Sequence, residues 1–226
     1  MRGHKINRIL TKTGDESPTF YIPELDEHYH SVHGAVRESE VIFIENLIKR
    51  LAKPKMKVFE TGFGTGLNAF LSFREAELMK KKISYHSIEL YPIERNEWIS
   101  CSMHFPYNNN DSQVYLRMHE APWDNEQEIS RFFSLKKINA DLITYKTSEK
   151  YDAIIFDAFG PDVQPELWTR DIFAKIFLMM KPGALLSTYS SKGEVRRNLE
   201  HAGLKVQRVP GPPGKRQIIL ASKAFR

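Results

Sequence analysis

Apolar residues recur along residues 55–226 in short runs that alternate with segments of helical spacing. The runs that predict strands are KVFET (57–61), SYHSIEL (84–90), FFSLKKINADLI (132–143), YDAIIFDAFGP (151–161) and ALLSTYS (184–190). The segments that predict helices are 38–52, 67–81, 93–103, 171–183 and 193–203. Strands that alternate with helices predict an α/β fold with a mostly parallel, doubly wound sheet.

Two further strands and one loop complete the expected domain. LKVQRV (204–209) and RQIILAS (216–222) form a closing pair, which the short turn between them would make antiparallel. Residues 105–128 show no clear period, so we expect a loop-rich stretch there. The helix over 171–183 should end at its Pro-Gly pair, because proline cannot continue a helix.

The first part of the chain has a different character. Residues 1–37 are polar and aromatic, and Pro23 and Gly34 break them into short extended pieces. We therefore expect an N-terminal extension over 1–37 that packs near a substrate pocket, and one domain over 38–226.

Three glycines follow the first strand of this domain at alternate positions. Gly62, Gly64 and Gly66 come after Glu60 and directly before a helix, at the sheet edge where such folds bind ligands. The spacing is neither the GxGxxG of dinucleotide-binding folds nor a P-loop, and no basic residue follows to meet a phosphate. The acid at the strand end suits a cationic ligand.

Further acids fall at the ends of neighbouring strands. Glu89 ends the second strand, where nucleotide-binding sheets place a carboxylate for ribose hydroxyls. Asp141 follows the third strand, although capping of a turn is an equally simple role for it. Asp157 ends the most apolar strand and is flanked by Phe156 and Phe159. These acids predict one polar crevice at the carboxyl edge of the sheet.

Several motifs together resemble the tRNA wobble-uridine methyltransferases that make 5-methylaminomethyl-2-thiouridine. GFGTGLN resembles motif I of the Rossmann-like class I methyltransferases that use S-adenosylmethionine. The more specific stretches are GAVRESEVIFI (34–44), DAFGPDVQPELWT (157–169), STYSSKGEVRRNLEHAGLKV (187–206) and GPPGKRQ (211–217). The strand end reads Asp-Ala-Phe, where this family commonly has Asp-Gly-Phe. The resemblance covers about residues 17–222.

The resemblance implies a cofactor, a substrate and roles for named residues. The cofactor would be S-adenosylmethionine, bound by Glu60, Gly62, Phe63, Gly64, Gly66, Asn68, Glu89, Asp141 and Asp157. The reaction would be N-methylation of the 5-aminomethyl group of (2-thio)uridine at the wobble position. Asp157 would accept a hydrogen bond from the substrate amine, and Phe159 would stack on the uracil ring unless it packs in the core. Glu38 would line the substrate pocket.

The positive charge is concentrated near the C-terminus. Residues 181–226 carry ten Lys or Arg and two Glu, whereas the rest of the chain carries 23 basic and 26 acidic residues. This imbalance indicates a polyanion-facing surface or a plain solvated face. With the resemblance, we expect contact with the tRNA anticodon stem-loop through Lys192, Arg196, Arg197, Lys215 and Arg216.

Other features narrow the class of protein. Cys101 is the single cysteine, which excludes an internal disulfide and a cysteine-based zinc site. No apolar run of membrane length and no signal peptide is visible, so we expect a cytoplasmic protein. EHYHSVH (27–33) could hold a metal, but the resemblance implies none, and we expect a polar loop over the substrate instead. No second glycine fingerprint for FAD follows, which implies a stand-alone form whose aminomethyl substrate another enzyme system makes.

Three alternatives remain open at this point. A small-molecule amine methyltransferase or a spermidine-synthase-like aminopropyltransferase would use a similar sheet, although the basic C-terminal part disfavours a polycationic substrate. A non-catalytic RNA-binding domain would keep the fold without the cofactor, which the intact set of acids and glycines argues against. A nicotinamide oxidoreductase is disfavoured by the glycine spacing.

Overall fold

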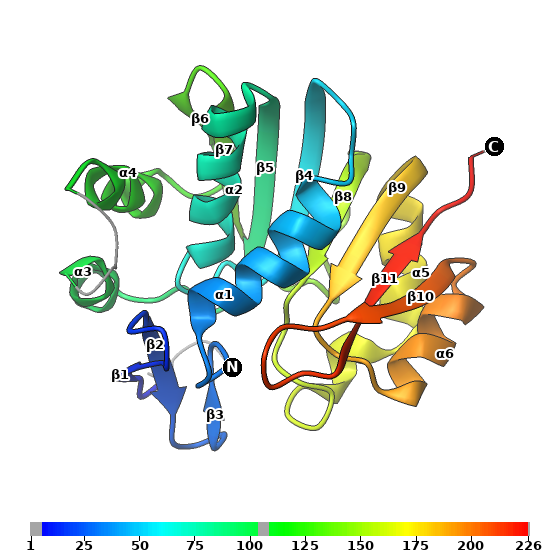
Figure 1. The fold of residues 1–226 in the computed structure, drawn as a ribbon, viewed down its shortest axis with the longest axis horizontal. Helices are drawn as coiled ribbons and strands as arrows, with labels where there is room; N and C mark the ends of the chain where they lie inside the picture. Colours follow the sequence, from blue (N-terminus) through cyan, green and yellow to red (C-terminus); the bar gives the residue numbers. More distant parts are fainter. Residues whose placement is uncertain (1–5, 104–108, 226) are drawn as a thin grey trace.

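The computed structural model describes residues 6–103 and 109–225 and shows an eight-stranded mixed sheet with a small N-terminal sheet beside it (Figure 1). The strand order of the large sheet is β10-β11-β9-β8-β4-β5-β7-β6. The five central strands are parallel, while β11, β10 and β6 pair antiparallel with their neighbours. The predicted mostly parallel sheet with an antiparallel closing pair is confirmed.

Seven strands of this sheet overlap the expected ones, whereas β6 was not expected. Their bounds are β4 (Lys55–Thr61), β5 (Lys82–Glu89), β6 (Glu126–Ser130), β7 (Phe133–Asn139), β8 (Tyr151–Phe156), β9 (Met180–Thr188), β10 (Lys205–Pro210) and β11 (Gln217–Ser222). Every residue of β8 is buried, as a strand covered on both faces requires. Because β4 pairs with both β8 and β5, the carboxyl ends of these three strands meet at one edge.

Helices cover both faces of the sheet. The helices are α1 (Ala35–Ser39), α2 (Leu67–Met79), α3 (Arg95–Met103), α4 (Asn109–Glu120), α5 (Arg170–Met179) and α6 (Gly193–His201), with a π-helix (Glu40–Ile48) and a 3-10 helix (Pro165–Trp168). One buried cluster joins the π-helix, α2, α3 and α4 to the sheet, and a second joins α5 and α6 to the opposite face. No helix in the described part of the chain is both long and apolar enough to cross a bilayer.

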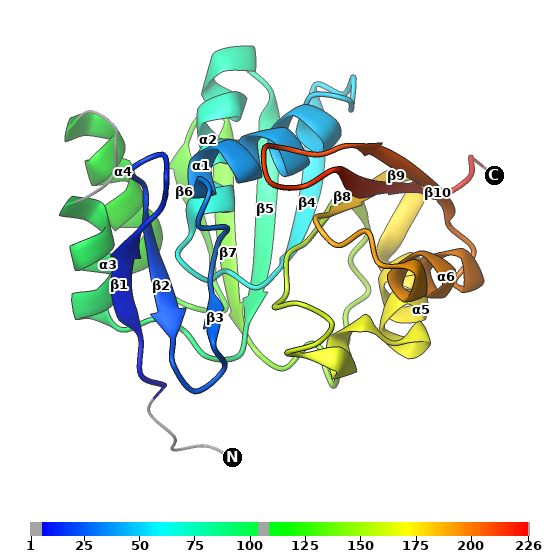
Figure 2. The same ribbon diagram turned by 60° about the horizontal axis from the view of Figure 1, so that its bottom comes forward.

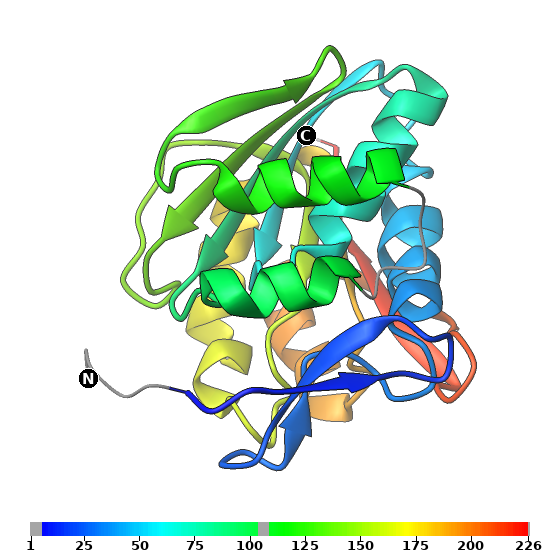
Figure 3. The ribbon, with the colours of Figure 1, turned by 90° about the vertical axis from the view of Figure 1, so that its left-hand side faces the viewer.

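The N-terminal extension forms a separate three-stranded antiparallel sheet. Its strands are β1 (Ile9–Lys12), β2 (Pro18–Ile22) and β3 (Glu27–His28). Figures 2 and 3 show this sheet beside the lower ends of β4 and β5, with α3 and then α4 stacked next to it. Its first five residues lie outside the described part.

Two expectations about the elements were wrong. The stretch expected to be loop-rich contains α4 and β6, although its residues 104–108 lie outside the described part. The helical pattern in α4 is carried by a few buried residues, Tyr115, Met118 and His119, among many polar ones. The helix expected to end at Pro182 stops at Met179, and Pro182 lies inside β9, where the pairing with β8 shifts register.

Candidate functional site

The glycine loop after β4 adopts a backbone that only glycine adopts readily. Gly62, Gly64 and Gly66 have φ angles of +86°, +51° and +77°. A Cβ atom at Gly62 would lie 3.2 Å from the carbonyl oxygen of Asp157, and one at Gly64 would lie 3.1 Å from the Tyr29 ring. The loop therefore has little room for side chains between β8 and the N-terminal extension.

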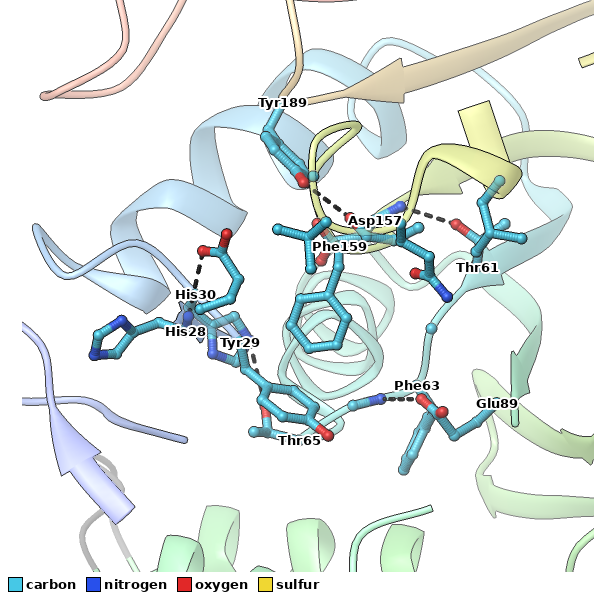
Figure 4. Close-up of a pocket in the computed structure, with 18 of the residues that line it drawn as sticks. His28, Tyr29, His30, Thr61, Phe63, Thr65, Glu89, Asp157, Phe159 and Tyr189 are labelled. Atoms are coloured by element: carbon cyan, nitrogen blue, oxygen red, sulfur yellow. Dashed lines mark hydrogen bonds between the residues drawn. The ribbon is translucent and has the colours of Figure 1, made fainter. Parts of the chain in front are cut away.

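This loop borders a cavity of about 1050 Å³. The cavity also reaches the carboxyl ends of β5, β7 and β8, the N-terminal extension and the β10–β11 turn (Figure 4). It brings together most of the predicted site residues: Glu38, Gly62, Phe63, Gly64, Asn68, Glu89, Asp141, Asp157, Phe159 and Lys215. Residues from segments far apart in the sequence thus share one chamber.

The other predicted residues lie elsewhere. Glu60 is buried beneath the glycine loop, with 1% of its surface exposed. The remaining ones, Gly66, Lys192, Arg196, Arg197 and Arg216, do not line the cavity. Lys192 forms an ion pair with Asp162. Of the basic residues expected to bind tRNA, Lys215 alone therefore lines the cavity.

Two acids at the sheet edge hold backbone turns. The Glu89 carboxylate accepts hydrogen bonds from the Gly64 N–H at 3.1 Å and the Tyr91 N–H at 2.8 Å. It thereby fixes the glycine loop against the end of β5. Asp141 accepts a hydrogen bond from the Ile143 N–H at 2.8 Å, which is the turn-capping role considered for it. Both side chains nonetheless line the cavity.

Asp157 and Glu60 each accept a hydrogen bond from a neighbouring side chain. The Asn68 side-chain amide donates to Asp157 Oδ2 at 2.7 Å, and Ser87 Oγ donates to Glu60 Oε2 at 2.6 Å. Burial raises the pKa of Glu60 to about 8 and that of Asp157 to about 7. Asn68 Oδ1 is buried and has no hydrogen-bond partner within the described residues, so it can accept one from a ligand.

Asp157 is held in place by the neighbouring strand. Its backbone N–H donates to Thr61 Oγ1 at 3.0 Å, at the point where β4 and β8 end side by side. Next to it, Phe159 packs edge-on against Tyr29 with ring centroids 5.2 Å apart. The Trp168 indole donates to the Phe159 carbonyl at 2.8 Å. An acid and an aromatic wall therefore face the same space (Figure 4).

Two tyrosines of the cavity had no individual role in the prediction, although Tyr29 lies in the segment expected to form a loop over the substrate. Tyr29 comes from the N-terminal extension, and its hydroxyl accepts a hydrogen bond from Arg8 Nε at 2.8 Å. Arg8 also pairs with Glu97 at 3.2 Å, which ties the extension to α3. Tyr189 follows β9 and donates its hydroxyl hydrogen to the Ala158 carbonyl at 2.9 Å. An aromatic residue within an otherwise polar stretch was the available signal at both tyrosines.

The histidine-rich segment forms part of the cavity wall. His28, His30 and His33 all line the cavity. His30 lies within hydrogen-bond distance of Thr19 Oγ1 at 3.1 Å and of Thr65 Oγ1 at 3.4 Å, and burial lowers its pKa to about 4. Among residues 6–103 and 109–225, no group of three His, Cys, Asp or Glu side chains is arranged to hold a metal.

Glu38 links the N-terminal extension to the β10–β11 turn across the cavity wall. Its carboxylate accepts a hydrogen bond from the Ser31 N–H at 3.0 Å and forms an ion pair with Lys215 Nζ at 2.9 Å. The Lys215 ammonium also lies 4.9 Å from the centre of the Tyr189 ring. Glu38, Lys215 and Tyr189 thus form a polar corner of the same cavity that Asp157 lines.

Comparison with known proteins agrees with this arrangement. A family model described as S-adenosyl-L-methionine-dependent methyltransferase matches residues 122–224. The structure of MnmC2 from Aquifex aeolicus superimposes with a TM-score of 0.81 and 26% identity, over 99% of this chain and 72% of that one. The chain is an S-adenosylmethionine-dependent methyltransferase.

Sequence relatives of this methyltransferase share a more specific name. The protein from Pseudomonas entomophila named tRNA 5-methylaminomethyl-2-thiouridine biosynthesis bifunctional protein MnmC is 28% identical over 210 residues, or 87% of this chain. A protein of the same name from Pseudomonas fluorescens is 29% identical over 208 residues. The methyltransferase spans about a third of the length of these curated relatives, 32% in both cases.

Spermidine synthase from Thermotoga maritima shares the fold of this methyltransferase. It superimposes with a TM-score of 0.53 and 16% identity, over 98% of this chain and 75% of that one. At that identity the likeness concerns the arrangement of helices and strands alone.

Proposed function

We propose that this methyltransferase transfers a methyl group to the exocyclic amine of 5-aminomethyl-(2-thio)uridine at the wobble position of tRNA. The observation that carries the proposal is the half-buried Asp157 carboxyl at the end of β8, facing a large cavity beside an aromatic wall. The names of the relatives and the similar structure support this substrate. An acid in that position is suited to receive an amine.

The cavity residues fit S-adenosylmethionine. Its amino-acid end carries an ammonium group, which matches the unpartnered oxygen of Asn68 in the cavity wall. The backbone of Gly62 and Gly64 can approach a ligand closely, because no side chain intervenes. Glu89 ends the strand next to this loop and would accept hydrogen bonds from ribose hydroxyls. When bound, the cofactor supplies a methyl group on a sulfonium.

The residues on the other side of the cavity would place the amine. Asp157 would accept a hydrogen bond from the substrate amine and direct the nitrogen lone pair toward the methyl carbon. After transfer, Asp157 or water would take the proton that the product ammonium has to lose. Phe159 and Tyr29 would hold the uracil ring, because aromatic side chains stack on unpaired bases. Alignment of this kind can supply most of the acceleration of a two-reactant displacement.

The direct test is transfer of labelled methyl to tRNA from cells that lack this gene, followed by nucleoside mass analysis. We expect 5-methylaminomethyluridine to appear as its aminomethyl precursor disappears. If cofactor binding is measurable but no tRNA is methylated, the tRNA substrate is refuted, and small amines become the substrates to test.

The role of Asp157 is tested by the substitution Asp157→Asn. We expect kcat to fall by about 10²–10⁴, as is typical when a positioned acid or base is lost, with little change in cofactor affinity. Burial raises the pKa of Asp157 to about 7, so the wild-type rate should rise with pH through that value as the carboxylate forms. Equal loss of cofactor affinity and turnover would contradict the role assigned to this residue.

A further inference from the structure

We propose that the backbone of the RNA substrate runs along a band of four exposed arginines, Arg37, Arg197, Arg208 and Arg216, and reaches the cavity at Lys215. This inference rests on the proposed tRNA substrate. The four residues, called the arginine band below, come from α1, α6, β10 and the β10–β11 turn. Two of them, Arg37 and Arg208, were not among the residues expected to bind tRNA.

The inner part of the band is continuous with the cavity wall. The β10–β11 turn lies against the N-terminal extension, since a Cβ atom at Gly214 would be 2.7 Å from the His33 ring. Figures 1 and 2 both show this turn next to α1. Arg37 precedes Glu38 on α1, and Arg216 follows Lys215 on the turn. Because Glu38 and Lys215 form an ion pair at 2.9 Å, the backbones that carry the two arginines are held close together.

The outer part of the band continues from β10 to α6. Arg208 Nη2 donates to the Ser191 carbonyl, at 3.4 Å, in the segment that leads into α6. One turn into that helix, Arg197 lies over its start, since its Nη1 is 3.2 Å from a Cβ atom placed at Gly193. These contacts place Arg208 and Arg197 against the same segment, residues 191–193, at the start of α6.

The charges of the band are available to a partner. All four arginines are exposed, and none forms an ion pair with a carboxylate in residues 6–103 and 109–225. The neighbouring cations differ, because Lys192 pairs with Asp162 and Arg196 pairs with Glu200 at 3.0 Å. Arginine also binds phosphate oxygens through two parallel N–H groups. An RNA backbone supplies a regular series of such partners.

Lys215 gives the band an end point inside the site. Its side chain is 30% exposed and is neutralised by Glu38 in the ligand-free protein. A phosphate group that takes over Lys215 would release the Glu38 carboxylate toward the cavity that Asp157 also lines. The arrival of RNA would thereby add a second acid to the site that receives the amine.

The test compares the wild-type protein with Arg208→Gln/Arg216→Gln in binding a fluorescent anticodon stem-loop RNA between 50 and 200 mM salt. We expect affinity at low salt to fall roughly tenfold, and the slope of log K against log salt to decrease by about 1.4, at about 0.7 for each phosphate contact on single strands. The matched control is Lys80→Gln/Lys82→Gln, which removes two charges where α2 ends and β5 begins, at the sheet edge opposite the cavity. It should leave affinity and slope unchanged.

The outcomes separate this inference from the proposed function. If the wild-type protein binds the RNA and Arg208→Gln/Arg216→Gln binds it with the same affinity and slope, the band is refuted while the tRNA substrate stands. If the wild-type protein binds cofactor but no RNA, the proposed substrate itself fails. Equal binding of poly-glutamate and RNA, with the same salt slope, would make the band a surface for an acidic protein and overturn its assignment to RNA.

Discussion

Replacing Glu60 by Gln should change how the stability of the ligand-free protein depends on pH. Glu60 is 1% exposed, and burial raises its pKa from 4.5 to about 8. Between these values the folded protein holds a proton that the unfolded chain has lost. The stabilisation from this proton is complete below pH 4.5 and disappears as pH rises through about 8. The free energy of unfolding should therefore fall by about 1.4 kcal/mol per pH unit in this window.

The total effect is large on the scale of a domain's stability. The gap between 4.5 and about 8 corresponds to on the order of 5 kcal/mol. Because glutamine does not titrate, the free energy of unfolding of Glu60→Gln minus that of the wild-type protein should increase with pH from about 5 to 8. Urea unfolding followed by tryptophan fluorescence at several pH values measures this difference. A difference that stays constant from pH 5 to 9 would refute the reasoning.

A second variant shows whether the titration belongs to Glu60. Ser87 Oγ donates to the Glu60 carboxylate at 2.6 Å, and this bond favours the ionised form. The substitution Ser87→Ala removes the donor with little change of volume. The pKa of Glu60 should then rise further, and the loss of stability should extend to higher pH. An unchanged pH window in Ser87→Ala would assign the titration to another group.

Two further substitutions test parts that support the site. Arg8→Met removes a side chain that is 4% exposed and paired with Glu97. We expect the free energy of unfolding to fall by about 3 kcal/mol. KM for the cofactor should rise while kcat stays nearly unchanged, because Arg8 holds the N-terminal extension against α3. A lower kcat with an unchanged KM in steady-state kinetics would contradict this role. Gly66→Ala places a Cβ atom 3.0 Å from the Phe63 ring at a φ of +77° and should destabilise by about 1–3 kcal/mol in urea unfolding. Gly160→Ala, without positive φ, is its control, and equal losses in the two variants would refute the strain argument.

Elements with a strong local pattern of apolar residues could be predicted from the sequence. β8 is fully buried and flanked by helices, so its apolar run was unmistakable. α4 was missed because its buried face is small and most of its remaining residues are polar. β9 was placed four residues late, because Pro182 reads as a helix stop although it lies within the strand, where the pairing with β8 is irregular.

Some residues of the site could likewise be predicted from the local sequence, and others could not. The glycine loop, Glu89 and Asp157 follow directly from strand ends, since parallel strands bring their carboxyl ends to one edge. Tyr29 and Arg8 could not be placed, because their roles depend on how the N-terminal sheet docks against α3 and the glycine loop. That docking depends on contacts between residues far apart in the sequence, and local periodicity does not reveal such contacts.

The buried acids of the site argue for a cationic ligand independently of any relative. Burial destabilises the ionised forms of Glu60 and Asp157, and the charge of Asp157 raises the pKa of Glu60 further. Asn68 donates to Asp157 but leaves its own oxygen without a partner in the described part of the protein. A fold selected for stability alone would replace such a cluster with apolar residues. The ammonium and sulfonium groups of S-adenosylmethionine, together with the proposed substrate amine, would recover the free energy that burial of these acids costs.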